Sequence, residues 1–405
     1  MNSKSKLLKV RNYRKQHGLK KTIEKILQKF AGQFSFVGQF NSRKSNLISL
    51  YKDILAHPHG GCSIDEFIEP NSFQWVIPNF GFGSGGHLNI FRFISMLAKR
   101  GYKQHIVIVG SHGWQSPKAA LEAIEEWYLP VDASLAFGEK GFIPSQFTFA
   151  TGWQTAYWVN HYQATKEKYY FIQDFEPYFY PVSTEFALAE DTYKLGMKAI
   201  TAGSWLSEKL AREYGMECFD ISFSYDKELY QPSPRQKNSK FRILFYSRHV
   251  TPRRMFGLGL LALDELCQKY GNITVIFVGG DVSTFQIPFR HTNLGEIALD
   301  ALPDLYSQCD LALVLSGTNL SLLPLELAAC KCPVVLNDSA SSNWLLPPNA
   351  AFYAPMNAGK LYEVLETAYL DEDLRSKKAE NAYQVALSSS WDDQAEKMIE
   401  HLGIS

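Results

Sequence analysis

From residue 73 onward, short apolar runs alternate with segments in which apolar residues recur every three or four positions. Continuous apolar runs are typical of parallel strands buried on both faces, and the longer spacing is that of one helix face. The strands predicted from this pattern are 73–78, 106–109, 134–137, 169–172, 199–202, 217–223, 243–246, 274–278, 311–315 and 334–336. The predicted helices are 87–100, 117–128, 153–161, 205–214, 255–270, 300–308, 322–331, the helical stretch 358–386, and 391–402.

A change of character at residues 224–240 divides this alternation into two blocks. The segment carries two prolines, many charges and few apolar residues, which predicts a linker. The blocks at 70–230 and 240–389 each have the size and rhythm of a doubly wound α/β domain, and a basic helical extension over 1–69 precedes them. Ligands of such sheets bind beyond the carboxyl ends of the strands. The expected site is therefore an interdomain cleft between two facing Rossmann-like domains.

The first predicted strand leads into the glycine-rich sequence GFGSGG at 81–86 and then into a helix. Glycines allow the backbone to approach an anion, and the helix start supplies free N–H groups, so the loop predicts contact with a diphosphate. The G-x-G-x-x-G spacing raises a dinucleotide-dependent oxidoreductase as one alternative, and a purely structural turn as another. The dinucleotide fingerprint also needs a carboxylate at the end of the second strand, and VIVGSH at 107–112 has none.

Two further segments follow strands of the second block and offer partners for an anion. Arg248 and Arg253 come directly after the strand 243–246, where their guanidinium groups would suit phosphate oxygens. A surface basic run is the alternative. Glu326 is the single acid on an otherwise apolar helix, which needs a partner because a buried carboxylate is costly alone. A pair of sugar hydroxyls would serve as that partner.

Two carboxylates follow the strand 169–172 and are candidates for acid–base work. Asp174 and Glu176 stand two residues apart, where either could accept a hydroxyl proton or orient an acceptor sugar, and Asp174 is favoured. A capping carboxylate with a structural ion pair is the alternative. His87 begins the first helix and could contact the acceptor or the donor sugar, or only cap the helix.

Charge is balanced over the whole chain but not along it. The 405 residues include 41 basic and 41 acidic ones, so there is no overall basic excess of the kind that indicates a nucleic-acid-binding protein. Residues 1–30 hold ten Lys or Arg and one Glu. This segment predicts either adhesion to an anionic membrane surface or a solvated helix packed on the domain. No membrane span or secretory signal is recognisable, so we expect a cytoplasmic protein, peripheral on the inner face of the cell membrane if residues 1–30 bind it.

Neither a metal nor another cofactor is expected. The six cysteines are scattered, as in a protein with reduced structural thiols, and His57 and His59 fit a polar turn. The D-x-D string at 371–373 lies between two C-terminal helices rather than at the carboxyl edge of a strand. We therefore expect a solvated helix boundary there.

Four stretches carry a resemblance to a known family: VIPNFGFGSGGHLNIFR at 76–92, YFIQDFEPYFYP at 170–181, YSRHVTPRR at 246–254 and LSLLPLELAACKCPVV at 320–335. Over residues 70–405 the chain resembles GT-B glycosyltransferases of glycosyltransferase family four. Within that family it is similar to the WsaF-type rhamnosyltransferases of bacterial surface-glycan synthesis. The resemblance implies that the last helix, within 390–405, packs on the first domain.

The resemblance also implies roles for individual residues in binding a nucleotide sugar. Glu326 would hold the ribose, and Leu294 would lie where backbone groups hold the nucleobase. Where the family commonly has a second glutamate, this chain has Thr318, which favours a deoxysugar such as rhamnose. The implied contacts to the diphosphate come from backbone N–H groups and arginines: Gly85, Gly86, Arg248, Arg253, Ser321 and Leu322.

The expected activity is therefore transfer of rhamnose from dTDP-rhamnose to a glycan or lipid-linked glycan acceptor of a growing bacterial surface polysaccharide. We expect the reaction to be metal-independent and, from the resemblance, to retain the anomeric configuration. Arginines and helix N-termini can stabilise the leaving diphosphate without a metal. The alternatives are the oxidoreductase and a non-catalytic sugar-binding scaffold protein.

Overall fold

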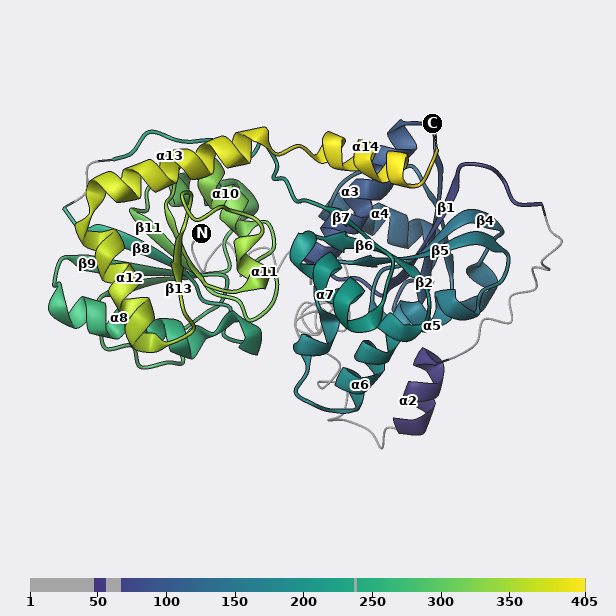
Figure 1. Cartoon of the computed structure of the whole chain (residues 1–405), viewed down its shortest axis with the longest axis horizontal. Helices are drawn as coiled ribbons and strands as arrows, with labels where there is room; N and C mark the ends of the chain where they lie inside the picture. The colour runs from purple at the N-terminus through teal and green to yellow at the C-terminus, as the bar shows by residue number, and fades with distance from the viewer. Residues whose placement is uncertain (1–46, 56–66, 237–238, 405) are drawn as a thin grey trace, which may run out of the picture. The chain divides into compact units, whose positions relative to one another are not determined.

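A computed structural model describes residues 47–55, 67–236 and 239–404. They form two parallel α/β sheets (Figure 1) and two compact units, one ending at Lys168 and the other beginning at Tyr169. The unit boundary falls within strand β5 (Thr165–Ile172). The basic segment 1–30, together with His57, His59 and Cys62, lies outside the described residues, so the expectations about them stay predictions.

The first sheet has the strand order β3-β2-β1-β4-β5-β6-β7. The strand pairs β1–β2, β1–β4, β2–β3, β5–β6 and β6–β7 are parallel. Trp75 of β1, for example, lies beside Ile106 on one side and Phe149 on the other. Buried apolar residues form much of the central strands, as the sequence pattern predicted, whereas the two edge strands are only partly buried. The strands are β1 (Ser72–Pro78), β2 (Lys103–Val109), β3 (Ser134–Phe137), β4 (Ser145–Ala150), β5 (Thr165–Ile172), β6 (Lys198–Ala202) and β7 (Cys218–Ile221).

Strand β4 was not predicted because its polar residues resemble those of a surface segment. Thr148 is fully buried, and its hydroxyl accepts from Gln74 Nε2 at 3.4 Å and donates to Thr165 Oγ1 at 2.9 Å. Because these groups satisfy one another, the sheet tolerates them in its interior. Polar residues that bond across strands are invisible to a pattern based on hydrophobicity.

Of the helices around the first sheet, α3, α4, α5 and α7 were predicted, whereas α2 and α6 were not. Helix α3 starts after the N-cap Ser84, whose hydroxyl accepts from His87 N, and α4 starts in the same way after Ser116. Helix α2 packs beside α5. The helices are α2 (Leu47–Ile54), α3 (Gly85–Lys99), α4 (Pro117–Trp127), α5 (Trp153–His161), α6 (Thr184–Asp191) and α7 (Ser204–Tyr214).

The second sheet has the strand order β10-β9-β8-β11-β12-β13, again parallel throughout. The four central strands were predicted and the two edge strands were not. Four of the five residues of β10 are exposed, so that strand carries no apolar run. The strands are β8 (Phe241–Tyr246), β9 (Ile273–Val278), β10 (His291–Gly295), β11 (Leu311–Val314), β12 (Val334–Asn337) and β13 (Phe352–Ala354).

Helices α8 and α12 pack together, and so do α10 and α13. The last helix, α14, packs on β7: the His401 ring stacks on Phe219 at 4.2 Å, and Gln394 Oε1 accepts from Ser222 N at 2.8 Å. No helix within the described ranges is both long and apolar enough to cross a bilayer. The helices are α8 (Phe256–Lys269), α9 (Leu302–Ser307), α10 (Leu323–Ala329), α11 (Ala340–Asn343), α12 (Ala358–Leu370), α13 (Glu372–Ser388) and α14 (Trp391–His401).

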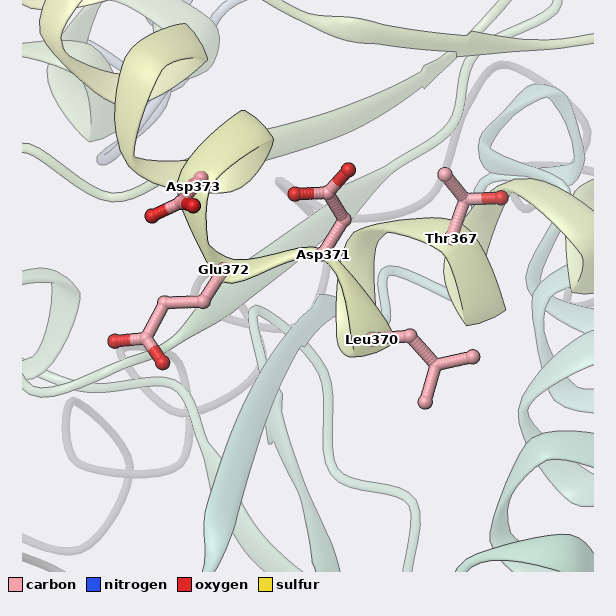
Figure 2. Close-up of a pocket in the computed structure, with 5 residues that line it drawn as sticks. All are labelled: Thr367, Leu370, Asp371, Glu372 and Asp373. Atoms are coloured by element: carbon pink, nitrogen blue, oxygen red, sulfur yellow. The ribbon is translucent and has the colours of Figure 1, made fainter.

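The D-x-D string marks the boundary between α12 and α13, as predicted. Asp371 is the N-cap of α13, and its Oδ1 accepts from Leu374 N at 2.9 Å. Figure 2 shows the Glu372 and Asp373 side chains beside an open hollow that Thr367 also lines, with the carboxylates pointing in different directions. One carboxylate is thus used by the helix, and the other two do not converge.

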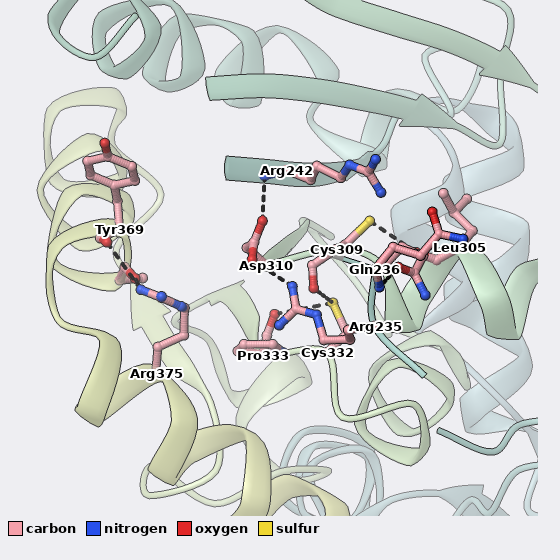
Figure 3. Close-up of polar contacts among 12 residues, drawn as sticks. Arg235, Gln236, Arg242, Leu305, Cys309, Asp310, Cys332, Pro333, Tyr369 and Arg375 are labelled. Carbon is pink, nitrogen blue, oxygen red and sulfur yellow. Dashed lines mark hydrogen bonds and ion pairs between the residues drawn. The ribbon is translucent and has the colours of Figure 1, made fainter. Parts of the chain in front are cut away.

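The predicted linker forms neither a helix nor a strand over its described residues, but it is anchored to the second sheet (Figure 3). Asp310 accepts from Arg235 Nη2 at 2.6 Å through one oxygen and from Arg242 N at 2.7 Å through the other. Tyr225 and Tyr230 are buried in the core around α10. The segment therefore contributes two aromatic rings to that core, which its overall polarity concealed.

The five cysteines within the described residues are free thiols, as predicted. Cys309 and Cys332 lie in the buried region behind Asp310 (Figure 3), and burial raises the pKa of Cys330 to about 12. A thiol with so high a pKa is unreactive near neutral pH, so the three buried cysteines, Cys309, Cys330 and Cys332, serve as packing.

Candidate functional site

Asp174 lies at the centre of a polar cluster that follows the carboxyl end of β5. Its Oδ1 accepts from the backbone N–H groups of Phe175 at 2.8 Å and Asn319 at 3.2 Å. Its Oδ2 accepts from Thr318 Oγ1 at 2.8 Å. The side chain is buried together with Thr318, which is only 1% exposed. Three donors of the chain itself therefore fix the orientation of this carboxylate.

Burial raises the pKa of Asp174 above the ordinary value of 3.8, although the positive charge of Arg253 and the Thr318 hydrogen bond oppose the shift. A raised pKa makes the carboxylate a stronger proton acceptor than an exposed aspartate. The three hydrogen bonds also suit an orienting role, because they occupy both oxygens. The cluster can thus hold a positive group or a hydroxyl in a defined place.

Glu176 is buried two residues further on, where it begins the short 3-10 helix η3 (Glu176–Phe179). Its Oε1 accepts from Tyr170 Oη at 2.9 Å, and its backbone N–H donates to Tyr193 Oη at 3.1 Å. Burial first, and then the charge of Glu176, raises the pKa of Tyr170 well above its usual value. Glu176 is therefore held among tyrosines, apart from the hydrogen bonds of Asp174.

Two arginines stand next to Asp174 on the 3-10 helix η5 (Pro252–Arg254), which follows β8. The guanidinium of Arg253 lies 4.4 Å from the centre of the Phe179 ring, and Arg254 Nη1 donates to Asn319 O at 3.2 Å. Burial lowers the pKa of both guanidinium groups, and the charge of Asp174 opposes that shift in each. Both remain cations at neutral pH.

The Nε atoms of Arg253 and Arg254 are buried and have no hydrogen-bond partner among the described residues. Unsatisfied buried donors are uncommon in folded proteins and call for a partner such as an ordered water, an ion or a ligand. Arg248, in the same loop, adds its charge to the environment of both. The cluster of three arginines is therefore suited to an anion with several oxygens.

The loop after β11 contains two of the residues that were expected to bind the diphosphate. Ser321 adopts a left-handed conformation with φ of 63°, and its N–H donates to Asn319 Oδ1 at 3.1 Å. Leu322 is 7% exposed and immediately precedes α10. In this structure the Ser321 N–H is thus engaged within the chain, an arrangement that the sequence did not foreshadow.

Glu326 lies in the first turn of α10 and has a partner that the sequence did not suggest. The hydroxyl of Tyr230 forms a hydrogen bond with it, and the Tyr230 and Tyr306 rings stack with centroids 6.1 Å apart. Burial, followed by the charge of Glu326, raises the pKa of both tyrosines. Tyr230 comes from the segment predicted to be a linker, which explains why it was overlooked.

Leu294 lies on the edge strand β10 and is 38% exposed. Next to it, Gly295 O accepts from Gly279 N at 2.8 Å. Gly279 has φ of +94°, and a Cβ there would lie 2.5 Å from the Tyr246 ring, so only glycine fits this close approach. A Gly-Gly pair directly after a strand is a signal that sequence reasoning could have used here.

The first unit holds the other predicted site residues. Gly85 and Gly86 are the exposed first residues of α3. His87 Nδ1 lies 2.8 Å from Ser84 Oγ, and Tyr128 Oη donates to Gly81 O. Desolvation lowers the pKa of His87 to about 4, against the effect of the Pro78 carbonyl, so the ring is neutral at neutral pH.

The second unit thus brings together Asp174, Arg253 and Thr318, and it places Glu326 against Tyr230. Asn319 and Arg254 belong to the same cluster and were not predicted as site residues. Within residues 47–55, 67–236 and 239–404, no group of three or more His, Cys, Asp or Glu side chains is arranged to hold a metal ion.

Comparison with known proteins relates this chain to a known family. The family model for the WsaF C-terminal domain matches residues 241–366, and that for the WsaF N-terminal domain matches residues 142–202. The O-antigen biosynthesis protein RfbC of Myxococcus xanthus is 30% identical over 346 residues. The match covers 81% of this chain and 26% of RfbC, so the chain spans about a quarter of that relative's length.

Solved structures share the fold at low sequence identity. Anabaena Alr3699/HepE, solved in complex with UDP, has a TM-score of 0.63 at 17% identity, covering 82% of this chain and 99% of that one. WaaG, a glycosyltransferase involved in lipopolysaccharide biosynthesis, has a TM-score of 0.58 at 15% identity, covering 82% and 99%. Sucrose-phosphate synthase from Thermosynechococcus elongatus has a TM-score of 0.61 at 14% identity, covering 82% and 98%. These matches confirm the GT-B fold and the resemblance to WsaF-like GT-B glycosyltransferases that the sequence showed.

Proposed function

We propose that this protein transfers a sugar from a nucleoside diphosphate donor onto a growing bacterial surface polysaccharide. The family match supports the class of reaction, and the name of the Myxococcus xanthus relative supports the class of product. UDP and UDP-glucose are bound in structures of Anabaena HepE, which supports a nucleotide-sugar donor here.

One observation carries the proposal: Arg253 and Arg254 stand beside Asp174 with buried Nε donors that no described residue satisfies. A diphosphate offers several oxygens in the geometry that guanidinium groups bind best. The cluster follows β8 and β11 at their carboxyl ends, the edge at which parallel α/β sheets bind ligands.

In the proposed reaction, the bond between the anomeric carbon and the diphosphate oxygen breaks, and the diphosphate leaves with the electron pair. Arg248, Arg253 and Arg254 balance the charge that develops on it. The acceptor oxygen forms the new bond to the anomeric carbon and loses its proton. Asp174, with its raised pKa, would orient that hydroxyl or take the proton.

We propose dTDP-rhamnose as the donor, a retaining outcome and no requirement for a metal. The position at which related enzymes commonly carry a glutamate is Thr318, and its hydroxyl is used by Asp174. A neutral residue there has fewer hydrogen bonds to offer a sugar, which suits a deoxysugar. Glu326 would hold the ribose by exchanging its Tyr230 hydrogen bond for ribose hydroxyls, and the start of α3 at Gly85 and Gly86 would meet a phosphate.

Thermal shift with dTDP and UDP, in the presence of a chelator, tests the proposal. Either nucleotide should stabilise the wild-type protein without a divalent ion, and Arg253→Ala should remove the shift. Absence of a shift with both nucleotides at millimolar concentration would contradict the proposal. Hydrolysis of dTDP-rhamnose compared with UDP-glucose then separates the two donor classes.

A further inference from the structure

Asn319 is only 4% exposed, and both its side chain and its backbone are hydrogen-bonded. Its side-chain Oδ1 accepts from Ser321 N at 3.1 Å, and its Nδ2 donates to Gln173 O at 2.8 Å. Its backbone N–H donates to Asp174 Oδ1 at 3.2 Å, and its carbonyl accepts from Arg254 Nη1 at 3.2 Å. Ser316 Oγ also donates to that carbonyl, at 3.0 Å.

The side-chain and the backbone hydrogen bonds of Asn319 have different roles. The side-chain amide bridges the residue before Asp174 and the residue at φ of 63°, so it fixes the orientation of its own peptide groups. Those peptide groups then hold the Asp174 carboxylate on one side and the Arg254 guanidinium on the other. The left-handed conformation is less favourable for serine than for glycine, and the hydrogen bond from Ser321 N to the Asn319 amide offsets part of that cost.

The arginine pair is the part of this arrangement that has unused capacity. Arg254 donates one hydrogen bond from Nη1 to Asn319 O. The buried Nε atoms of Arg253 and Arg254 both lack a hydrogen-bond partner among the described residues. The charge of Asp174 acts on both guanidinium groups. Displacing the Asn319 peptide would therefore move a partner of Arg254 and a donor to Asp174 at the same time.

We propose that Asn319 is a positioning residue of the donor site: its side chain holds Asp174 and Arg254 in the arrangement in which the arginines bind the diphosphate of a nucleotide sugar. The inference rests on the proposed function and adds to it a residue that would not itself touch the donor. Asn319 acts through the arginines and Asp174, so its loss weakens binding without removing a ligand contact.

The test is calorimetric binding of UDP and dTDP to the full chain and to four variants. Asn319→Ala removes both side-chain hydrogen bonds and should raise the dissociation constant about tenfold. Asn319→Asp keeps the acceptor for Ser321 N but places a second carboxylate beside Asp174 and the arginines, so the loss should be larger. Asn381→Ala is the matched control, because it removes an amide-to-carbonyl hydrogen bond to Asn349 O of 2.8 Å in an exposed position, and it should bind as the wild type does.

The double variant Asn319→Ala with Ser321→Gly separates positioning from general damage. Glycine adopts the left-handed conformation without the amide, so the second change should recover a large part of the affinity. A simple loss of folding would not be repaired by a glycine. Circular dichroism and melting curves of each variant show which fraction is folded.

The outcomes separate the two proposals. Wild-type binding with unchanged affinity in folded Asn319→Ala, or weakened binding that Ser321→Gly does not improve, would overturn the role of Asn319 alone. Failure of the wild type to bind either nucleotide would overturn the proposed function, and the assignment of Asn319 with it.

Discussion

The hydroxyl of Thr318 donates a 2.8 Å hydrogen bond to Asp174 Oδ2, which joins the end of β5 to the loop after β11 across 144 positions of the sequence. Both residues are buried, so the carboxylate is removed from water and depends on donors within the chain. Desolvation has a larger effect on the pKa of Asp174 than those donors and the nearby arginine charge, so the pKa is raised. The stability of the protein therefore depends on pH through this carboxylate.

Replacing Asp174 by asparagine should change how stability depends on pH. Since the pKa is higher in the folded protein than in the unfolded chain, the folded state binds the proton more tightly, and the wild type loses stability as pH rises from 3.8 through the raised pKa. The Asp174→Asn variant has no titrating group at this position, so its melting temperature minus that of the wild type should increase with pH and then level off. Asp300→Asn, at an exposed position, is the control. A difference that falls with pH would contradict the buried, desolvated carboxylate.

Two glycines of helix α8 should respond to alanine in opposite directions. A Cβ at Gly259 would lie 2.2 Å from the Phe245 ring, so Gly259→Ala should overpack the core and cost about 1–3 kcal/mol. Gly257 in the same helix is exposed with nothing within 4 Å, and Gly257→Ala should stabilise by about 0.5 kcal/mol through the unfolded state. Urea unfolding of both variants checks the pair. Similar effects of the two changes would mean that Phe245 does not pack on this helix.

The main strands could be predicted from the sequence because burial on both faces leaves a continuous apolar run, as in β2 and β8. Arg253 could be predicted for a related reason: it follows such a run, and strand ends carry function. Asn319 could not, since its partners Gln173 and Asp174 lie 146 and 145 positions away. Hydrogen bonds over that separation leave no local periodicity.

Glu326 illustrates a partial success of sequence reasoning. An acid on an apolar helix was expected to need a partner, and the structure supplies one in Tyr230. The partner could not be identified, because Tyr230 lies in a proline-containing polar segment whose aromatic residues gave no periodic signal. Strand β4 was missed for the converse reason, since its polar residues satisfy one another inside the sheet.

Asp310 should contribute more to stability than its ion pair with Arg235 alone would, because it also accepts a backbone hydrogen bond. Asp310→Ala leaves Arg242 N without its acceptor as well as breaking the pair with Arg235, and we expect a loss of about 1–3 kcal/mol. Arg235→Ala breaks only a pair whose arginine is 52% exposed, and it should cost less than about 1 kcal/mol. Denaturant unfolding compares them. Equal losses in the two variants would show that the backbone hydrogen bond contributes little.

His87 should make the protein less stable in acid. Its pKa is lowered from 6.5 to about 4 by burial, so the folded state favours the neutral ring while the unfolded chain takes up a proton below pH 6.5. Stability should therefore fall progressively between pH 6.5 and 4, by at most about 3 kcal/mol from this group. His87→Asn, which keeps a polar side chain near Ser84 without a titrating ring, should flatten that part of the profile, whereas His291→Asn at an exposed position should leave it unchanged.

Denaturant unfolding at about pH 4.5 and 7 measures the difference, and an NMR titration of the His87 ring should give a midpoint near 4. If the wild type and His87→Asn lose stability equally over this range, the ring is solvated and its pKa is not lowered by burial. Any contact of His87 with a sugar in acid would then be made by a protonated ring.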